Sequence, residues 1–564
     1  MTFSFSFLKK TVFQDLFILA LLASVLFGAF LGSRPFANPD EGRYVEIPRE
    51  MLLTHDFITP RLNGVKYFEK PILFYWMEAC SLKAFGLNEW AARLVPMILA
   101  LVGVLSVYLA GRFLFNRKTG FYAALTLMTS ALYFVFAHII LLDMALTLFL
   151  SLGLLSFLGG FYTPPSLKRR LLMYGTSLFF GLAFLTKGVV TLALAGPIIV
   201  LWLTFYKLWR KLWPLYLPTS LLLFLGLVLP WHVLVSFKNP EFLWFYFIQE
   251  HFLRYTTTIH SREQPIWFFL PCLFFGLFPW VFYAFQSLKK IGSTLLKERF
   301  LNEKEGFLLL WTLFPFLFFS FSHSKLIPYI LPIFPSLSLL IGNFLTSKTQ
   351  TKNSLEFKVY LGILLLLTLG LIGIYYLTSL IPDFLKPYTI FGIFFLWSGV
   401  FLGPLVLKIT QFRALLPEVP LIFMGTFIFY IFIASLSPLI PYQSTKSIAL
   451  TIQEKIPATT EIIALKTYPP DLAIYLNLNH PLTLIDSIGE LKFGTELESP
   501  SWILPLSEFS KKWSSSQKVC AVMKKNAFSS FEEMNLPKRM IPLLSKKQLP
   551  NCSPLSSYVL LCNH

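Results

Sequence analysis

The chain alternates between long apolar stretches and short polar ones. Apolar windows long enough to cross a bilayer as a helix recur from residue 12 to residue 438. They predict about thirteen transmembrane helices, near residues 12–33, 91–111, 119–137, 143–160, 171–186, 188–206, 215–236, 266–287, 306–322, 326–345, 357–380, 388–408 and 418–438. Some boundaries lie inside one long apolar stretch that a charge, Gly or Pro interrupts, around Asp143, Lys187 and Ser324. The pattern predicts an all-α polytopic domain over residues 1–439.

The pattern changes after about residue 440, where the apolar runs become short. Five of these runs have the length and composition of β-strands, namely Ile462–Lys466, Leu482–Ile485, Trp502–Leu506, Lys518–Met523 and Tyr558–Cys562. Polar or helical segments separate them. We therefore predict a small C-terminal α/β domain over residues 440–564.

Composition supports a membrane protein. The 564 residues are 55% hydrophobic, 17% aromatic and only 14% charged, with a mean hydropathy of +0.65, which exceeds what a soluble globular protein needs. The net charge of +19 reflects Lys and Arg in the loops, so no nucleic-acid partner is predicted. Lys9 and Lys10 precede the first apolar run, but no small-residue cleavage site follows it, so we expect this run to stay as the first helix.

The basic residues predict the topology. They gather at the N-terminus and in every second loop, at Lys9/Lys10, Arg112/Arg117/Lys118, Lys168/Arg169/Arg170, Lys207/Arg210/Lys211, Lys289/Lys290/Lys297/Arg299, Lys348/Lys352/Lys358 and Lys408/Arg413. By the positive-inside rule these loops and the N-terminus are cytoplasmic. The other loops, among them 34–90, 238–265 and 381–387, then face the opposite side together with the C-terminal domain.

The first loop on that opposite side, residues 34–90, has the densest polar stretch of the membrane domain. Its segment 38–76 begins with the adjacent acids Asp40 and Glu41 and ends with Glu69, Lys70 and a proline. Because the segment is too charged for hydrocarbon, it lies at the membrane surface or lines a cavity. Within it, Arg49–Phe57 is expected to form a short interfacial helix.

Ionisable residues interrupt the apolar pattern at several other points on the same side. Asp143 lies between two apolar runs and costs about 2.5–3.5 kcal/mol if it faces lipid, so it should face a cavity or a partner. The cations on this side are Lys70, Lys187, Arg254, Arg262 and Lys325. Such a set suits a lipid phosphate, while the nearby carboxylates suit general-base work or the orientation of a sugar. Plainer interpretations stay open, namely helix capping for the acids and snorkelling to the interface for the bases.

Metal and cysteine chemistry leave little trace in the sequence. Glu69 and His251 offer two ligands for a divalent metal if their loops meet, and no other cofactor is indicated. The five cysteines show no zinc-site spacing, and a disulfide between Cys552 and Cys562 is compatible with an extracytoplasmic tail. The chain contains no nucleotide-binding signature such as GxGxxG or GxxxxGK[ST].

Several of these stretches match a known family in order. They are PDEGRYVEIPREML, YFEKPILFYW, LLDMAL, LTKG, EHFLRY followed by HSREQPIWFF, SFSHSKLIPYILPIFP and, in the tail, GELKFGT at Gly489–Thr495. In these stretches the chain resembles the aminoarabinose transferases of lipid A modification, within the polyprenyl-phosphate-dependent GT-C glycosyltransferases, which also include the protein mannosyltransferases. The resemblance implies thirteen helices, a periplasmic C-terminal domain and residence in the bacterial inner membrane. The tail after Thr495 shows no such match.

The resemblance also implies roles for individual residues. The predicted catalytic carboxylates are Asp40, Asp143 and Glu41, with Asp40 as the loop aspartate. The predicted substrate-binding residues are Arg43, Tyr44, Tyr67, Lys70, Lys187, Arg254, Tyr329 and Lys325, of which Lys70, Arg254 and Tyr329 would hold the carrier phosphate. The implied donor is an undecaprenyl-phosphate-linked sugar and the implied acceptor is lipid A, with membrane lipids around both.

Three functions remain open at this point. The first is transfer of 4-amino-4-deoxy-L-arabinose to a lipid A phosphate, a modification associated with polymyxin resistance. The second is transfer of another sugar, such as galacturonic acid, a hexosamine or mannose, to lipid A, its core or protein. The third is transport of lipid-linked sugars, which is disfavoured because the polar residues gather on one face and the sequence shows no internal repeat.

Overall fold

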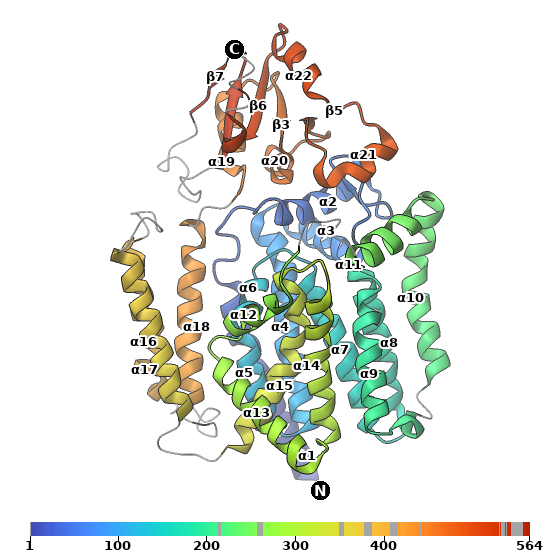
Figure 1. Cartoon of the computed structure of the whole chain (residues 1–564), viewed down its shortest axis with the longest axis vertical. Helices are drawn as coiled ribbons and strands as arrows, with labels where there is room; N and C mark the ends of the chain where they lie inside the picture. Colours follow the sequence, from blue (N-terminus) through green and yellow to red (C-terminus); the bar gives the residue numbers. More distant parts are fainter. Residues whose placement is uncertain are drawn as a thin grey trace.

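The membrane domain is a bundle of helices, and most of the long ones run roughly along one axis (Figure 1). The computed structural model describes residues 2–212, 216–256, 263–348, 355–376, 386–406, 416, 418–439, 443–528, 531, 536, 538–542 and 557–563. Its helices are α1 (Thr2–Gly28), α4 (Glu89–Leu114), α5 (Arg117–Met128), α6 (Ala131–Phe136), α7 (Asp143–Tyr162), α8 (Leu167–Lys187), α9 (Val190–Phe205), α10 (Leu217–Lys238), α12 (Phe269–Gly276), α13 (Val281–Glu298), α14 (Glu303–Phe321), α15 (Phe334–Ser347), α16 (Leu355–Tyr376), α17 (Lys386–Val406) and α18 (Glu418–Leu436). Short 3-10 turns add η1 (Trp209–Leu212), η3 (Ile266–Phe268), η4 (Ile327–Ile333) and η6 (Ser437–Leu439).

Side-chain caps fix where several of these helices begin. Asn88, Asn116 and Ser166 precede α4, α5 and α8, and each accepts a hydrogen bond from the backbone N–H three residues later. Such caps satisfy amide groups that the first helical turn leaves without a partner. The boundaries between polar loop and apolar helix are therefore encoded locally.

Most helices lie near the predicted positions, and the chain is a membrane protein. The predicted helix 119–137 is divided into α5 and α6, and the predicted helix 326–345 into η4 and α15. Among the described residues, seven helices are long and apolar enough to cross a bilayer, or eight if the bent pair Ile266–Gly276 and Val281–Glu298 is one span. The count of thirteen crossings stays a prediction. The predicted loop at residues 381–387 falls mostly outside the described residues.

One end of the bundle carries the elements of the polar loops. They are α2 (Asp40–Thr54), β1 (Arg61–Leu62), β2 (Val65–Lys66), α3 (Leu73–Phe85), the π-helical segment η2 (Trp244–Leu253) and α11 (Arg254–Thr256). The short helix expected at Arg49–Phe57 begins earlier, at Asp40, so α2 includes the acidic pair in its first turn. Acidic side chains are favourable there because they interact with the positive end of the helix dipole.

The C-terminal domain is built around one mixed six-stranded sheet. Its elements are α19 (Lys446–Lys455), β3 (Glu461–Leu465), α20 (Pro470–Leu476), β4 (Thr483–Ile485), η7 (Gly489–Leu491), α21 (Lys492–Glu498), β5 (Ile503–Leu504), α22 (Leu506–Trp513), β6 (Val519–Lys524), η8 (Lys525–Ala527), β7 (Arg539–Met540) and β8 (Tyr558–Cys562). The strand order is β5-β4-β3-β6-β8-β7, with β5, β4, β3 and β6 parallel and β8 antiparallel to both of its neighbours. Five strands lie where the sequence predicted them, whereas the edge strand β7 was not predicted.

The two faces of this sheet pack against different cores. In β6, Cys520 and Val522 belong to the core that continues into the membrane domain. Val519, Ala521 and Met523 point to the other face, where α22 covers them with a separate apolar cluster. This is the alternation that a strand buried on both faces requires.

The disulfide of the tail differs from the prediction. Cys562 is bonded to Cys520, its direct partner in the antiparallel register of β6 and β8. Cys552 lies outside the described residues. The sequence suggested Cys552, which is near in the chain, whereas the register of β6 and β8 places Cys520 directly beside Cys562.

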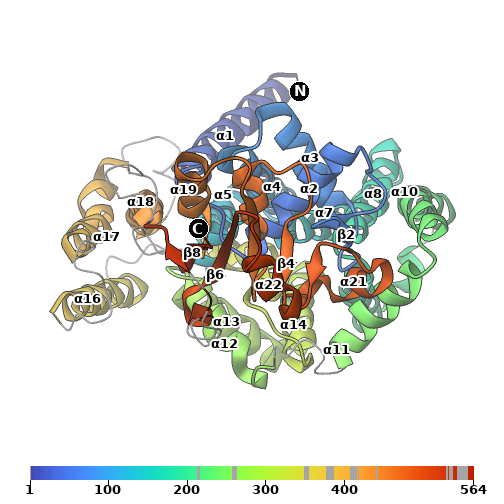
Figure 2. The same cartoon turned by 90° about the horizontal axis from the view of Figure 1, so that it is seen from above.

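The C-terminal domain lies on the end of the bundle that carries α2, and the N-terminus lies at the other end (Figure 1). Seen from above, the domain covers α2 and α4, while α16 and α17 stand to one side of it (Figure 2). Asn38 and Asn63 tie the first loop to the domain: the Asn38 N–H donates to the Gln443 oxygen at 2.8 Å, and Asn63 exchanges two hydrogen bonds with Leu482. This arrangement places the predicted catalytic loop between the bundle and the domain.

Candidate active site

A cavity of about 380 Å³ lies where the polar loops meet the ends of the helices. Charged side chains from separate elements line it, together with Tyr44, Tyr329 and several apolar residues. The basic ones are Arg34, Arg43, Lys70, Lys187 and Arg254, and the acidic ones are Asp40, Glu41, Glu69 and Asp143. The structure thus brings together residues from the first loop, the start of α7, the end of α8, and α11.

Asp40 is the most accessible of the predicted catalytic carboxylates. Its side chain is 54% exposed, and it forms an ion pair with Arg43 one helical turn later in α2. The Arg43 guanidinium is buried and forms a second ion pair, with Glu490 of the C-terminal domain. Its Nη1 also donates to the Tyr67 hydroxyl at 3.3 Å. Asp40 is therefore held through one buried arginine, yet keeps an open side toward the cavity.

The two predicted tyrosines of the first loop occupy different layers. Tyr44 lines the cavity, stacks on Tyr75 and meets the Phe74 ring edge-on. Tyr67 is buried behind Arg43 and is not among the lining residues. Burial raises the pKa of Tyr67 well above its ordinary value, so its hydroxyl stays protonated. Tyr67 thus supports Arg43 from behind.

The predicted carrier-phosphate residues form a second charged group. Arg254 donates from Nη1 to the Glu250 carboxylate at 2.8 Å and from Nη2 to the Tyr329 hydroxyl at 3.4 Å. Lys70 Nζ donates to the backbone oxygen of Glu69 at 2.7 Å and lies 4.0 Å from the Glu250 carboxylate. Burial, together with the charge of Arg254, lowers the pKa of Lys70 to about 7. Two adjacent cations with partly neutralised charge suit an anionic group such as a phosphate.

Asp143 and Lys187 meet as an ion pair across α7 and α8. Asp143 is the first residue of α7 and is buried, and Lys187 is the last residue of α8. The Lys187 ammonium also lies 4.6 Å from the centre of the Tyr329 ring. The two residues that interrupt the apolar pattern therefore neutralise each other at the wall of the cavity.

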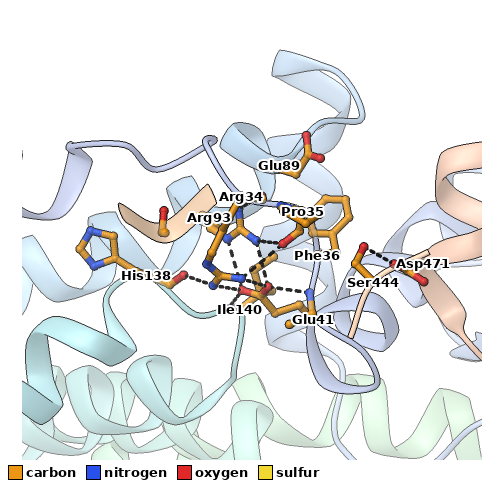
Figure 3. A network of polar contacts seen from close by, with 12 residues as sticks. Arg34, Pro35, Phe36, Glu41, Glu89, Arg93, His138, Ile140, Ser444 and Asp471 are labelled. Atoms are coloured by element: carbon orange, nitrogen blue, oxygen red, sulfur yellow. Dashed lines mark hydrogen bonds and ion pairs between the residues drawn. The ribbon is translucent and has the colours of Figure 1, made fainter. Parts of the chain in front are cut away.

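Glu41 has a structural environment, which argues against the catalytic role predicted for it. Its carboxylate accepts from Arg34 at 2.5 and 2.7 Å and from Arg93 at 2.9 and 3.2 Å (Figure 3). The backbone N–H groups of Ala37 and Ile140 donate to it as well. Burial alone would raise the pKa of Glu41, but the two guanidinium groups outweigh it and hold that pKa well below its ordinary value. A permanently charged carboxylate with both oxygens occupied holds the loop in place and is a poor proton acceptor.

Lys325 also departs from its predicted substrate-binding role. Its Nζ donates to the backbone oxygens of Ser322 at 2.6 Å and Gln264 at 2.8 Å, and it is not among the residues that line the cavity. Ser322 follows the end of α14, where carbonyl groups lack helical partners, and Lys325 donates to its oxygen. Arg262, the fifth predicted cation, lies outside the described residues.

The predicted metal ligands are only partly visible. Glu69 lies at the cavity wall with its carboxylate 3.9 Å from Arg254 Nη1. The side chain of His251 lies outside the described part of the chain. Among the described residues, no group of three or more His, Cys, Asp or Glu side chains could hold a metal ion. The metal site stays a prediction.

The sequence reasoning missed several residues that form ion pairs with the predicted ones, Arg93 beside Glu41 among them. Glu250 pairs with Arg254, Arg34 pairs with Glu41, and Glu490 pairs with Arg43. Glu250 directly precedes His251 in a polar cluster, and Glu490 lies inside the GELKFGT stretch, so both stood in segments of interest. Arg43 and Glu490 are distant in the chain, so no local pattern reports their pairing, whereas the spacing of Glu250 and Arg254 by four residues was a local signal that could have indicated theirs.

Comparisons with known proteins agree with this geometry. Residues 16–247 match the family model of dolichyl-phosphate-mannose-protein mannosyltransferases, and residues 448–548 match that of the aminoarabinose transferase C-terminal domain. The archaeal oligosaccharyltransferase from Archaeoglobus fulgidus shares the fold, with a TM-score of 0.52 and 13% identity over 93% of this chain and 70% of that one. Fold and site define a membrane glycosyltransferase of the GT-C class.

Closer relatives narrow the family. An undecaprenyl phosphate-alpha-4-amino-4-deoxy-L-arabinose arabinosyl transferase from Pectobacterium atrosepticum is 32% identical over 67% of each chain. ArnT from Cupriavidus metallidurans, solved bound to undecaprenyl phosphate, has a TM-score of 0.80 and 28% identity over 97% of each chain. The chain belongs to the aminoarabinose transferase family. Several other relatives align with this chain over about three fifths of their own length. One of them is the arabinosyl transferase of Yersinia enterocolitica, which is 33% identical.

Proposed function

We propose that this chain transfers 4-amino-4-deoxy-L-arabinose from undecaprenyl phosphate to a phosphate of lipid A. The observation that carries the proposal is the cavity, in which cations suited to a phosphate lie beside an accessible carboxylate. The names of the related arabinosyl transferases supply the sugar and the carrier. The match of residues 448–548 to the aminoarabinose transferase C-terminal domain favours this sugar over mannose.

The reaction replaces one glycosidic bond by another. The bond between the anomeric carbon of the sugar and the carrier phosphate oxygen breaks, and undecaprenyl phosphate leaves with both bonding electrons. An oxygen of the lipid A phosphate forms the new bond to the same carbon. Because the acceptor phosphate is already an anion, no proton has to be removed from it.

Lys70 and Arg254 act on the leaving group in this proposal. As the glycosidic bond breaks, negative charge develops on the carrier phosphate, and preorganised cations stabilise that charge more than they stabilise the bound donor. Lys70 supplies a point charge, while Arg254 supplies a planar set of donors that the Tyr329 hydroxyl and Glu250 hold in orientation.

Asp40 acts on the sugar. Its open side faces the cavity, and a carboxylate there attracts the ammonium group of an amino sugar. It therefore orients the donor rather than removing a proton. The Asp143–Lys187 pair lines the same cavity and presents a polar but neutral surface to the sugar.

The proposed location follows from the charge pattern of the loops. In Figure 1, α2 and the C-terminal domain lie at one end of the bundle, opposite the N-terminus, and residues of α2 line the cavity. The basic loops are assigned to the cytoplasm, so the reaction takes place on the periplasmic face of the bacterial inner membrane. Lipid A with added aminoarabinose carries less negative charge and binds cationic peptides such as polymyxin less strongly.

Mass spectrometry of lipid A tests the proposal. Cells that lack the gene for this chain but make the donor are complemented with the wild type or with Asp40→Ala. An aminopentose added to a lipid A phosphate with the wild type alone supports the proposal. A hexose or uronic acid on lipid A, or on protein, would instead indicate a related transferase of different sugar or acceptor specificity, an alternative consistent with the match to the mannosyltransferase model. Unchanged lipid A with a changed distribution of the lipid-linked sugar across the membrane points to transport.

A further inference from the structure

Glu490 is the one acidic residue of the described C-terminal domain that forms an ion pair with a residue of the cavity wall. It lies in η7, where the GELKFGT stretch begins, and its partner is Arg43 of α2. We propose that Glu490 is a positioning residue for sugar transfer, which acts through Arg43 to hold Asp40 in its working position. The inference rests on the proposed function and assigns part of the active site to the C-terminal domain.

The guanidinium of Arg43 joins the three residues. Nη2 pairs with Asp40, while Nη1 pairs with Glu490 and donates to Tyr67. Arg43 is buried, whereas the Asp40 carboxylate is half exposed and has no other described ion pair. The orientation of Asp40 therefore depends on that of Arg43, which in turn is fixed on its far side by Glu490.

Charge balance gives Glu490 a second effect. A buried guanidinium is costly unless anions compensate it, and here two carboxylates share that task. Without Glu490, the whole compensation falls on Asp40, which then has less negative charge to offer a cationic sugar. Burial raises the pKa of Glu490, and the charge of Arg43 opposes this rise.

The segment that carries Glu490 is anchored to the first loop and to η2. Phe493 stacks on Phe245 of η2 with ring centres 3.7 Å apart. A Cβ at Gly494 would collide with the backbone oxygen of Lys66, so only glycine allows this approach. Farther along α21, Glu498 forms a bidentate pair with Arg61 at 3.0 Å. Glu490 is thus presented to Arg43 from a surface packed closely against the loop.

The chain offers two matched controls for a Glu490→Gln variant. Glu498→Gln removes an ion pair between the same segment and the first loop, but one that does not reach the cavity. Glu496→Gln removes an exposed charge from the same helix, where its side chain is 64% exposed and pairs only weakly with Lys492. Glu498→Gln reports the effect of weakening the contact between the domain and the loop, and Glu496→Gln reports the effect of surface charge. A loss seen only in Glu490→Gln therefore reflects its connection to Asp40.

The experiment measures transfer by the full-length chain in detergent, with undecaprenyl-phosphate aminoarabinose as donor and lipid A as acceptor. We expect Glu490→Gln to lower kcat about tenfold and to change the donor KM less than about threefold, because it disturbs a group that acts on the sugar rather than on the carrier phosphate. Glu490→Asp, which keeps the charge, should retain more of the rate. Both control variants should stay within about twofold of the wild type.

A double-mutant cycle tests whether Glu490 acts through Arg43. In an Arg43→Lys background, where a single ammonium cannot hold two carboxylates in the same geometry, Glu490→Gln should cause little further loss. Thermal unfolding of each variant controls for folding.

Four results would overturn the inference. The Glu490→Gln variant could keep the wild-type kcat, or Glu498→Gln could lose as much kcat as Glu490→Gln does. In the double-mutant cycle, the losses of Arg43→Lys and Glu490→Gln could multiply as independent effects, or unfolding of Glu490→Gln could account for its whole loss of transfer. A wild-type chain that transfers no sugar would instead overturn the proposed function, and this role of Glu490 with it.

Discussion

Lys70 is the cavity cation whose charge depends on pH in the working range. Burial and the neighbouring Arg254 charge lower its pKa to about 7, and Glu250 and Glu69 only partly oppose this effect. At pH 7 about half of the protein therefore carries a neutral amine at this position. If Lys70 holds the carrier phosphate, binding of that anion favours the charged form and raises the pKa again.

The size of the effect follows from proton linkage. Binding takes up one proton wherever Lys70 is neutral in the free protein and charged in the complex, so the affinity falls as the pH rises above 7. Between pH 7 and pH 9 the Kd for undecaprenyl phosphate should increase about fiftyfold. The phosphate contributes little to this change, because a phosphomonoester has its second pKa near 6 and is mostly a dianion throughout the range.

Calorimetric titration of the detergent-solubilised chain with undecaprenyl phosphate at pH 7, 8 and 9 measures this dependence. Repeating each titration in two buffers with different ionisation enthalpies counts the protons taken up. In Lys70→Arg the guanidinium stays charged, so the Kd should vary less than about threefold. Lys66→Arg is the matched control. Lys66 lies in the same loop, but its ammonium forms an ion pair with Glu241 at 2.6 Å, and it does not line the cavity. A wild-type Kd that is equal at pH 7 and pH 9, or the same slope in Lys70→Arg, would refute the reasoning.

Three further predictions concern other residues of the site. Asp40→Ala should lower sugar transfer at least about 100-fold with an unchanged unfolding midpoint, since the side chain is half exposed; substantial transfer by this variant in membranes would exclude the role. Glu41→Gln should destabilise the protein by about 3–5 kcal/mol, because it leaves two buried arginines without their carboxylate, and an unchanged thermal midpoint would contradict this. EDTA should leave transfer within about twofold, because the Arg254 charge near Glu69 disfavours a divalent cation; a loss that Zn²⁺ or Mn²⁺ reverses would support the metal site predicted from Glu69 and His251.

The sequence predicted the elements of the fold well because their signals are local. A window of apolar residues has to be a helix in a bilayer, since no other single segment satisfies its own backbone there. The alternation in the tail likewise placed β3, β4, β5, β6 and β8. The edge strand β7 is only two residues long and both are exposed, so it carries no such pattern.

The residues of the cavity could be predicted for a related reason. An ionisable side chain between two apolar runs needs a polar environment, so Asp143 and Lys187 were expected at a cavity or against a partner. The structure gives them both, as an ion pair at the cavity wall. The sequence could not specify that they would pair with each other, because α7 and α8 meet only through tertiary packing.

Asp40 and Glu41 show where sequence reasoning fails. Adjacent residues of a helix point about 100° apart, so neighbours in an acidic pair face different surroundings. Glu41 turns toward Arg34 and Arg93 in the interior, while Asp40 remains half exposed at the cavity. Before the start of α2 at Asp40 was known, only the family resemblance singled out Asp40, and no local pattern showed that the two carboxylates have different surroundings.

The distribution of charge in the cavity indicates how the donor would bind. Arg43 shares its charge between Asp40 and Glu490, and Lys187 is paired with Asp143. Arg254 is paired with Glu250 and lies near Glu69, so a carrier phosphate reaches it only by competing with those carboxylates.

Lys70 differs from these cations. Its direct hydrogen bond goes to a backbone oxygen, and the carboxylate paired with it is 4.0 Å away, so it can turn to an anion at little cost. We therefore expect the phosphate to meet Lys70 first and Arg254 second. Because ion pairs have to be rearranged in that second step, the phosphate by itself contributes only modestly to affinity, and the polyprenyl chain has to contribute most of it. Because this rearrangement happens only with the donor bound, Arg254 is released from its carboxylate partners only then. Its charge is therefore available to the donor phosphate at the stage when negative charge develops there.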